Sequence, residues 1–170
     1  TVSPEDNVEI RRVSFTNLSS ERKTLEVTSY AEIALANPRA DAAHPCFSKM
    51  FVESEFYDER QCLVFSRRQR SVNEERLFFL HMANMRTQWA RVECETSRFE
   101  FIGRGNSVNN PKALKSEASL TGSVGNVLDP VCALRTHIEL ESGATESINF
   151  IYGAAKGKKT ILSYASRYRE

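Results

Sequence analysis

Apolar and polar side chains alternate with a period of two along most of this 170-residue chain. This spacing is typical of strands that bury one face against a second layer. The clearest stretches are residues 25–35, 132–141 and 147–152. So many short strands in series predict an all-β fold, an antiparallel β-sandwich. Further strands are predicted at residues 8–15, 49–57, 61–67, 76–83, 88–95 and 98–102.

Two loops in this pattern predict β-hairpins. Residues 141–146 form a short loop with a central glycine, which favours antiparallel pairing of the strands on either side. Residues 17–20 supply turn chemistry before the strand at 25–35, so that strand is expected to pair with the strand at 8–15. The first strand changes its apolar face part-way, which predicts a bulge near Arg11 and its neighbour.

Three segments interrupt the strand pattern. Residues 36–45 predict a loop with one helical turn, and residues 103–127 predict a long loop of the kind that is usually functional. From residue 158 the spacing becomes helical. We therefore expect a β-sandwich domain over residues 1–156 and the start of a linker helix over residues 157–170.

Composition excludes several classes of partner. A chain of this length forms about one domain, and its 23 basic and 22 acidic side chains nearly balance, so no nucleic acid partner is expected. No apolar run approaches the ~20 residues needed to span a bilayer, so direct membrane insertion is not expected. Cys46, Cys62, Cys94 and Cys132 lack metal-ligand spacing, which predicts reduced cysteines packed as small apolar groups, no metal, no cofactor and a cytoplasmic location.

The stretch His44–Glu55, with the sequence HPCFSKMFVESE, resembles a motif of the inverting glycoside phosphorylases, formerly glycosyltransferase family 36. The segments Asp6–Arg11, Leu25–Glu32, Phe101–Asn106 and Leu128–Arg135 support the match in the same order. The resemblance therefore runs nearly end to end. It is strongest to the phosphorylase-like part of cyclic β-1,2-glucan synthases.

This resemblance implies a partial galactose mutarotase-like supersandwich with a C-terminal helix. In the family, such a sandwich precedes a helical linker and an (α/α)6 barrel that carries the catalytic carboxylic acid and the phosphate site. No segment here matches the catalytic segment of the barrel, so no catalytic residue is assigned. The implied role is a non-catalytic, carbohydrate-binding or architectural module of a transferase or phosphorylase in carbohydrate metabolism. Its implied partners are a β-glucan or oligosaccharide, the barrel of the same polypeptide and a second copy in a homodimer, and the parent protein is expected to be anchored in the inner membrane.

Carbohydrate binding requires aromatic rings and planar polar side chains. Trp89 shares the polar face of a predicted strand with Arg91, and Tyr30 is placed similarly on another strand. Arg104 and Asn106 lie in a glycine-containing loop that matches the family pattern. We predict these residues as the carbohydrate site. The alternative is that a loop, the linker or the other half of a sandwich covers both rings.

A second set of residues is predicted to form a domain interface. Arg68 and Arg70 belong to a basic run that suits oxyanions at a domain boundary, although such runs are also common on solvated surfaces. His44 and Phe47 begin the family motif, and Gly103 permits a close backbone approach. These five residues are the predicted interface.

The family motif also has a structural interpretation. Phe47, Met50 and Val52 are expected to enter the core. Glu53 and Glu55 share the opposite face, and we interpret them as partners of the arginines rather than as a glycosidase pair.

Two alternative functions remain from sequence. One is mutarotase-like acid–base catalysis on a sugar ring, for which His44, His81 and His137 are the histidines available. Each is also consistent with a surface or hydrogen-bonded structural histidine. The other alternative is a purely structural dimerisation module without affinity for sugar.

Overall fold

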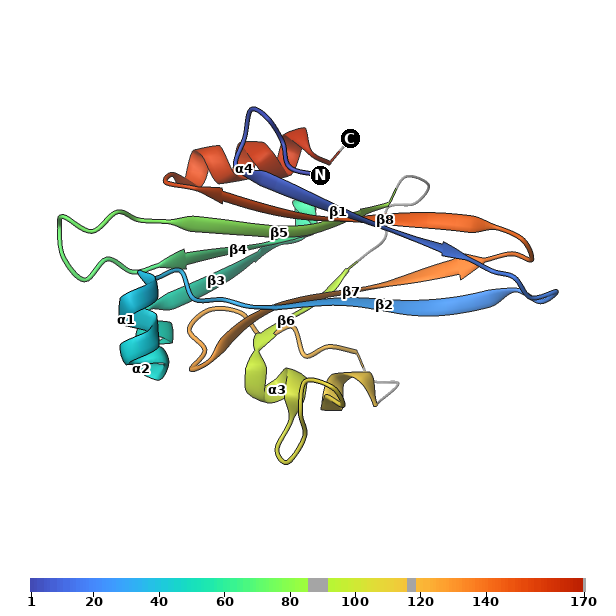
Figure 1. Ribbon diagram of the computed structural model, residues 1–170, viewed down its shortest axis with the longest axis horizontal. Coiled ribbons are helices and arrows are strands. Elements are labelled where there is room, and N and C mark those ends of the chain that lie inside the picture. Colours follow the sequence, from blue (N-terminus) through green and yellow to red (C-terminus); the bar gives the residue numbers. More distant parts are fainter. Residues whose placement is uncertain (86–91, 116–118, 170) are drawn as a thin grey trace.

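The computed structural model describes residues 1–85, 92–115 and 119–169, and these form two antiparallel sheets stacked face to face (Figure 1). The predicted all-β class and the C-terminal helix are confirmed. The strands are β1 (Val8–Thr16), β2 (Lys23–Glu32), β3 (Val52–Tyr57), β4 (Cys62–Arg67), β5 (Phe78–Met85), β6 (Glu93–Ser97), β7 (Pro130–Leu140) and β8 (Thr145–Ala155). The helices are α1 (Pro38–Ala43), α2 (Pro45–Lys49), α3 (Arg98–Ile102) and α4 (Lys158–Arg167), with short 3-10 turns η1 (Asp58–Arg60) and η2 (Lys112–Leu114).

One sheet has five strands in the order β1-β8-β5-β4-β3, and the other has three in the order β2-β7-β6. Helix α4 covers the outer face of the five-stranded sheet, whereas α3 and the loop after it cover the outer face of the three-stranded sheet (Figure 1). Strand β4 shows the consequence in its sequence. Cys62 and Val64 pack toward α4, while Leu63 and Phe65 pack between the sheets, so residues 62–65 form a continuous apolar run.

Both predicted hairpins are wrong, because each loop crosses from one sheet to the other. Strand β1 pairs with β8, and β2 pairs with β7, both antiparallel. The strands that are neighbours in sequence therefore stack across the core. Stacking buries their apolar side chains against each other, which pairing within one sheet would not do. The residues concerned are Phe15, Leu25, Val27, Ile138, Leu140, Ile148 and Phe150.

Asn17 fastens these two crossing loops to each other. Its side chain is buried, and Nδ2 donates to the carbonyl oxygens of Glu21 at 2.7 Å and Leu140 at 3.0 Å. Its backbone N–H donates to Ala144 O at 3.0 Å, and its carbonyl accepts from Gly143 N at 2.9 Å. Gly143 has φ +73°, a conformation that favours glycine. A single buried amide thus joins the β1–β2 loop to the β7–β8 loop.

The predicted bulge near Arg11 and Arg12 is also wrong. Strand β1 pairs with β8 without interruption, from Val8 opposite Gly153 to Thr16 opposite Thr145. The change of apolar face has another cause. The first half of β1 packs its apolar side chains under α4, and the second half packs Phe15 toward the other sheet.

The predicted strand at residues 98–102 is helix α3. Ser97 Oγ accepts a hydrogen bond from Glu100 N, which caps the helix, and the sequence Ser-x-x-Glu is a capping-box pattern. Phe101 and Ile102 are buried against the three-stranded sheet. The predicted strand at 88–95 is described only from residue 92, and β6 begins at Glu93.

The interrupting segments have defined structures. The predicted helical turn within residues 36–45 is α1, which is followed directly by α2. In the predicted loop, residues 120–125 connect the edges of the two sheets, because they bond to β6 on one side and β3 on the other. The contacts are Gly122 N to Cys94 O (3.0 Å), Thr96 N to Ser123 O (3.2 Å) and Gly125 N to Ser54 O (2.9 Å).

Helix α4 is part of the packed structure. It buries Ile161, Tyr164 and Ala165 on the five-stranded sheet. A Cβ at Gly153 would lie 3.4 Å from Tyr164 Cδ2, an ordinary van der Waals contact, so the helix packs directly over β8. The division between a sandwich over 1–156 and a linker helix over 157–170 stays a prediction.

The four cysteines are free thiols. Cys62, Cys94 and Cys132 are buried as expected, and burial raises the pKa of the Cys62 thiol to about 12. The expectation of a packed cysteine is wrong for Cys46, which is exposed on α2.

We predict that Asn17→Ala lowers the free energy of unfolding by about 2–3 kcal/mol, because it leaves buried carbonyl groups without donors. Chemical denaturation measures this change. The matched control is Asn109→Ala, an exposed asparagine whose loss should cost under about 0.5 kcal/mol. Equal effects of the two substitutions would show that Asn17 does not fasten the loops.

Candidate functional site

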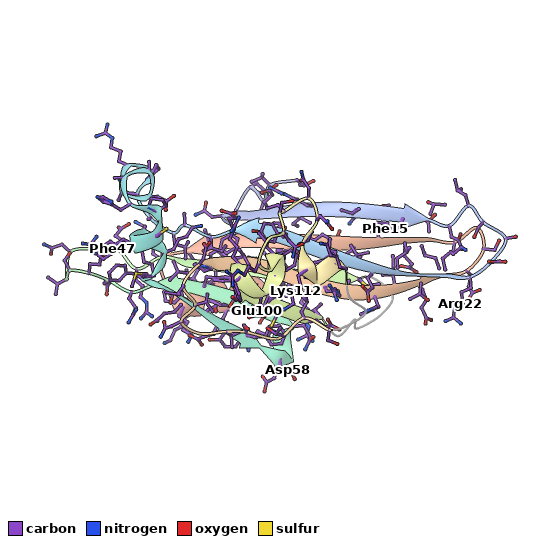
Figure 2. All side chains as sticks on the ribbon, turned by 90° about the horizontal axis from the view of Figure 1, so that it is seen from below. Phe15, Arg22, Phe47, Asp58, Glu100 and Lys112 are labelled. Atoms are coloured by element: carbon purple, nitrogen blue, oxygen red, sulfur yellow. The ribbon has the colours of Figure 1, made fainter. Side chains whose placement is uncertain are left out.

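Four of the five predicted interface residues come together at one end of the molecule. Helix α2 places Phe47 there (Figure 2), and the loop after β4 brings Arg68 and Arg70 beside it. His44 joins α1 to α2, with its N–H donating to Ala40 O. The fifth, Gly103, lies elsewhere, at the end of α3. The structure therefore unites two sequence segments about twenty residues apart, but it separates Gly103 from them.

We call Phe47, Met50, Phe51, Arg68 and Arg70 the Phe47 surface. Phe47 and Met50 are each 49% exposed. The rings of Phe47 and Phe51 meet edge to face at 5.2 Å. The Arg70 guanidinium lies 5.2 Å from the Phe47 centroid and 5.4 Å from the Phe51 centroid. Apolar and cationic groups thus alternate on an exposed surface.

The arginines of this region differ in their partners. Arg67 is buried and donates to Ser48 O at 2.5 Å, which holds α2 against the sheet. Arg68 pairs with Glu53 at 3.2 Å, as predicted. The Arg70 guanidinium forms no ion pair within 4.0 Å with any residue that the structure describes. The backbone N–H of Arg70 donates to Glu74 Oε2 at 2.6 Å, and its guanidinium remains available to a further carboxylate.

Two expectations about the motif are wrong. Phe47 and Met50 do not enter the core, because the segment is helical up to Lys49 and only Val52, at the start of β3, points inward. Among the residues that the structure describes, Glu55 forms its ion pair with a lysine and not with an arginine. Its carboxylate accepts from Lys158 Nζ of α4 at 2.8 Å, and this hydrogen bond lowers its pKa.

Three of the five predicted carbohydrate residues lie near α3. The Tyr30 ring packs on Phe101 with centroids 4.8 Å apart, and burial raises the pKa of Tyr30. Arg104 is exposed beyond the helix, and Asn106 Oδ1 accepts from Lys115 Nζ at 2.5 Å. Tyr30 therefore serves as packing for α3, in line with the alternative that a loop covers it. Trp89 and Arg91 lie outside the described residues.

Local backbone geometry explains why position 103 is a glycine. Its φ is +79°, and a Cβ there would lie 2.7 Å from Lys112 Cβ. Glycine thus lets η2 pack beside the end of α3, where Lys112 pairs with Glu100 at 3.3 Å (Figure 2).

Phe99 is an exposed aromatic residue that sequence reasoning missed. It is 65% exposed on α3, next to the loop that carries Arg104 and Asn106. Alternation with a period of two predicts a strand at residues 98–102. The capping pattern at Ser97 and Glu100 indicates a helix instead, and helical spacing puts Phe99 on the face opposite Phe101 and Ile102. We call Phe99, Arg104 and Asn106 the α3 surface.

A buried arginine lies beneath this loop. The Arg135 side chain is 1% exposed, and its Nη2 donates to Ala113 O while Nε donates to Thr28 Oγ1. Its Nη1 lies 3.8 Å from Glu93 Oε2. The alternation of residues along β7 places Arg135 on the polar face of the strand, but it does not indicate that the Arg135 side chain is buried. The loop over the three-stranded sheet is therefore held by charge as well as by apolar contact.

The three histidines lie in separate environments. His81 is fully buried between the sheets, with Nε2 2.7 Å from Ser29 Oγ and its ring stacked on Tyr152 at 4.4 Å. Burial lowers the pKa of His81 to about 4. His137 Nε2 lies 3.0 Å from Glu26 Oε1 at the surface of the three-stranded sheet. Mutarotase-like chemistry needs acid and base groups within reach of one sugar ring, and these histidines do not converge.

Within residues 1–85, 92–115 and 119–169, no group of three or more His, Cys, Asp or Glu side chains is arranged to hold a metal ion. In the same described residues, none of the helices has the length and apolar character required to cross a membrane.

The stacked sheets, with helices on both outer faces, define a β-sandwich domain on which the Phe47 surface and the α3 surface are exposed. Over residues 1–170 the chain matches the family model described as glycosyl hydrolase 94, supersandwich domain, and it belongs to this family. It is also 34% identical over 169 residues to "Cyclic beta-(1,2)-glucan synthase NdvB" of Rhizobium meliloti (strain 1021). That match covers 99% of this chain and 6% of the relative. The predicted resemblance and supersandwich class are confirmed.

We predict that the free energy of unfolding decreases as the pH is lowered, because His81 is buried in its neutral form. Its folded pKa of about 4 lies below the ordinary 6.5, so the unfolded chain takes up the proton first. The full contribution is present above pH 6.5 and is lost as pH falls toward 4, at up to about 1.4 kcal/mol per pH unit. Denaturation at several pH values measures this slope.

His81→Gln should remove this part of the slope, whereas the control His137→Gln, at an exposed position, should keep it. An unchanged slope in His81→Gln would show that another group causes the loss.

Proposed function

We propose that this domain is a non-catalytic module of a larger glucan synthase or glycoside phosphorylase, which packs against an (α/α)6 catalytic barrel of the same polypeptide and contacts the carbohydrate. Membership of the glycosyl hydrolase 94 supersandwich family supports this proposal, as does similarity to a glucan synthase of which the chain spans about 6%. The free cysteines favour work in a reducing cytoplasm.

The Phe47 surface is the observation that carries the docking proposal. Two large apolar side chains, Phe47 on α2 and Met50 just after it, are half exposed, and Arg68 and Arg70 lie beside them. Arginine and aromatic residues are enriched in the buried centres of interfaces, where they supply much of the binding energy. Arg67 fixes α2 from below, so the surface is formed before any partner arrives.

Charge favours the barrel over a second copy of this chain as the occupant. A symmetric contact through the Phe47 surface would bring Arg70 of one copy close to the arginines of the other, and like charges oppose such a contact. An acidic patch on a neighbouring domain would instead neutralise Arg70. We therefore place the dimerisation alternative second.

The α3 surface supports the carbohydrate part of the proposal. Phe99 offers an exposed ring, and the loop after α3 carries the planar polar groups of Arg104 and Asn106. Such groups are the usual means of holding a pyranose ring.

We predict that amides of residues 46–51 exchange with deuterium at least about tenfold more slowly in the full-length parent polypeptide than in the isolated domain, because docking covers the Phe47 surface. Hydrogen exchange followed by mass spectrometry measures this difference. Equal rates in the two samples would contradict docking through this surface.

Phe47→Asp in the full-length polypeptide should abolish the extra protection while changing the stability of the isolated domain by under about 0.5 kcal/mol, since its ring is exposed. The matched control is Leu18→Asp, an exposed apolar residue in the β1–β2 loop, which should leave the protection intact. Loss of protection in both variants would indicate general disruption.

A further inference from the structure

A cavity of about 340 Å³, widely open to solvent, lies between the N-terminal segment and the five-stranded sheet. Its lining includes Asn7, Glu9, Phe79, Tyr152 and Gly153. None of these residues belongs to the Phe47 surface or the α3 surface. The volume lies at the small end of the range of about 300–1,000 Å³ for ligand pockets, which suits one or two sugar rings.

Two aromatic rings form the apolar part of the cavity. The centroids of Phe79 and Tyr152 are 6.2 Å apart, with an angle of 33° between the ring planes. Tyr152 also stacks on the buried His81 ring at 4.4 Å and 11°, which fixes its orientation. The rings are therefore held in place before a ligand binds.

Polar groups converge on the same cavity. Arg11 donates two hydrogen bonds to Glu9, at 2.7 and 3.2 Å, and its guanidinium lies 5.0 Å from the Tyr152 centroid. The hydrogen bond from Arg11 holds the pKa of Glu9 below its ordinary value, so Glu9 remains a carboxylate acceptor. The Tyr152 hydroxyl and the Asn7 side-chain amide form no hydrogen bond with the described residues.

The rim of the cavity is fixed by backbone contacts. Ser3 N donates to Val8 O at 2.8 Å, and Ala154 N donates to Asn7 O at 2.9 Å. Asp6 is bound by Arg167 and by the Tyr168 hydroxyl of α4. The N-terminal segment is thus tied to both β8 and α4.

We infer that this cavity binds one or two glucose units of a β-glucan. The apolar Phe79 ring suits the C–H face of a pyranose ring, and a carboxylate, an amide and the Tyr152 phenol suit its hydroxyl groups. Glu5, Asp6 and Glu9 at the cavity disfavour an anionic ligand such as a sugar phosphate. This inference rests on the carbohydrate part of the proposed function and gives that contact a site distinct from the α3 surface.

The test is a titration of the folded 170-residue chain with sophorose and with linear β-1,2-gluco-oligosaccharides, followed by backbone amide shifts in NMR spectra. Saturable shifts clustered at Asn7, Gly153 and Ala154 are the expected result. Shifts clustered at Arg104 and Asn106 instead would overturn the cavity and leave carbohydrate contact on the α3 surface. No shift up to about 10 mM sugar would overturn both, while docking through the Phe47 surface would stand on its own test.

Two variants and two matched controls sharpen the result. Glu9→Gln and Tyr152→Phe should each weaken binding about three- to tenfold, since each removes one hydrogen-bonding group and keeps the shape of the side chain. Glu139→Gln and Tyr57→Phe change the same groups outside the cavity lining and should leave affinity unchanged. Equal affinities for all four variants would overturn the assignment even if sugar binds.

Discussion

The burial of the two inner sheet faces against each other is the constraint on which the rest of this structure depends. Both crossing loops exist because β1 and β2, and likewise β7 and β8, stack rather than pair. Stacking brings their apolar faces together, and that burial is the dominant favourable contribution to folding. The two crossing loops leave backbone carbonyl groups without a partner in a sheet. Asn17 donates hydrogen bonds to the carbonyl oxygens of Glu21 and Leu140.

The outer faces follow from this arrangement. A five-stranded sheet above a three-stranded one exposes apolar side chains on both outer faces, and different elements cover them: α4 on one side, and α3 with its loop on the other. The helix α2 packs differently, because Arg67 and the adjacent backbone hold it at one end of the sandwich. Its apolar side chains therefore remain outside the core. Ile161 is buried because α4 lies on an apolar sheet face, whereas α2 lies at the end of the sandwich, and Phe47 therefore stays exposed.

Alternation alone predicted the class, the antiparallel sheets and most strands, because a period of two depends only on local burial. It could not predict which strands pair, since stacked and paired neighbours show the same alternation. The bulge at Arg11 failed for a related reason: apolar side chains on both faces of β1 indicate cover on both faces, not a shift in register. Phe47 was singled out through a family motif and Arg68 and Arg70 through a basic run, and the structure supplied their proximity. The cavity at Tyr152 could not be predicted from the sequence, because its lining residues come from three separate parts of the chain.

The acidic groups of the domain favour binding over catalysis. Glu53 is paired with Arg68 and Glu55 with Lys158, while the buried Glu95 accepts from Ser97 N and Thr121 Oγ1. General acid catalysis at neutral pH needs a carboxyl group whose pKa is raised toward 7. Glu9 at the cavity shows the opposite direction, because Arg11 stabilises its charged form. A carboxylate that stays charged accepts hydrogen bonds from sugar hydroxyls but donates no proton to a glycosidic oxygen. The pairing with Arg11 therefore suits Glu9 to accepting hydrogen bonds and not to general acid catalysis.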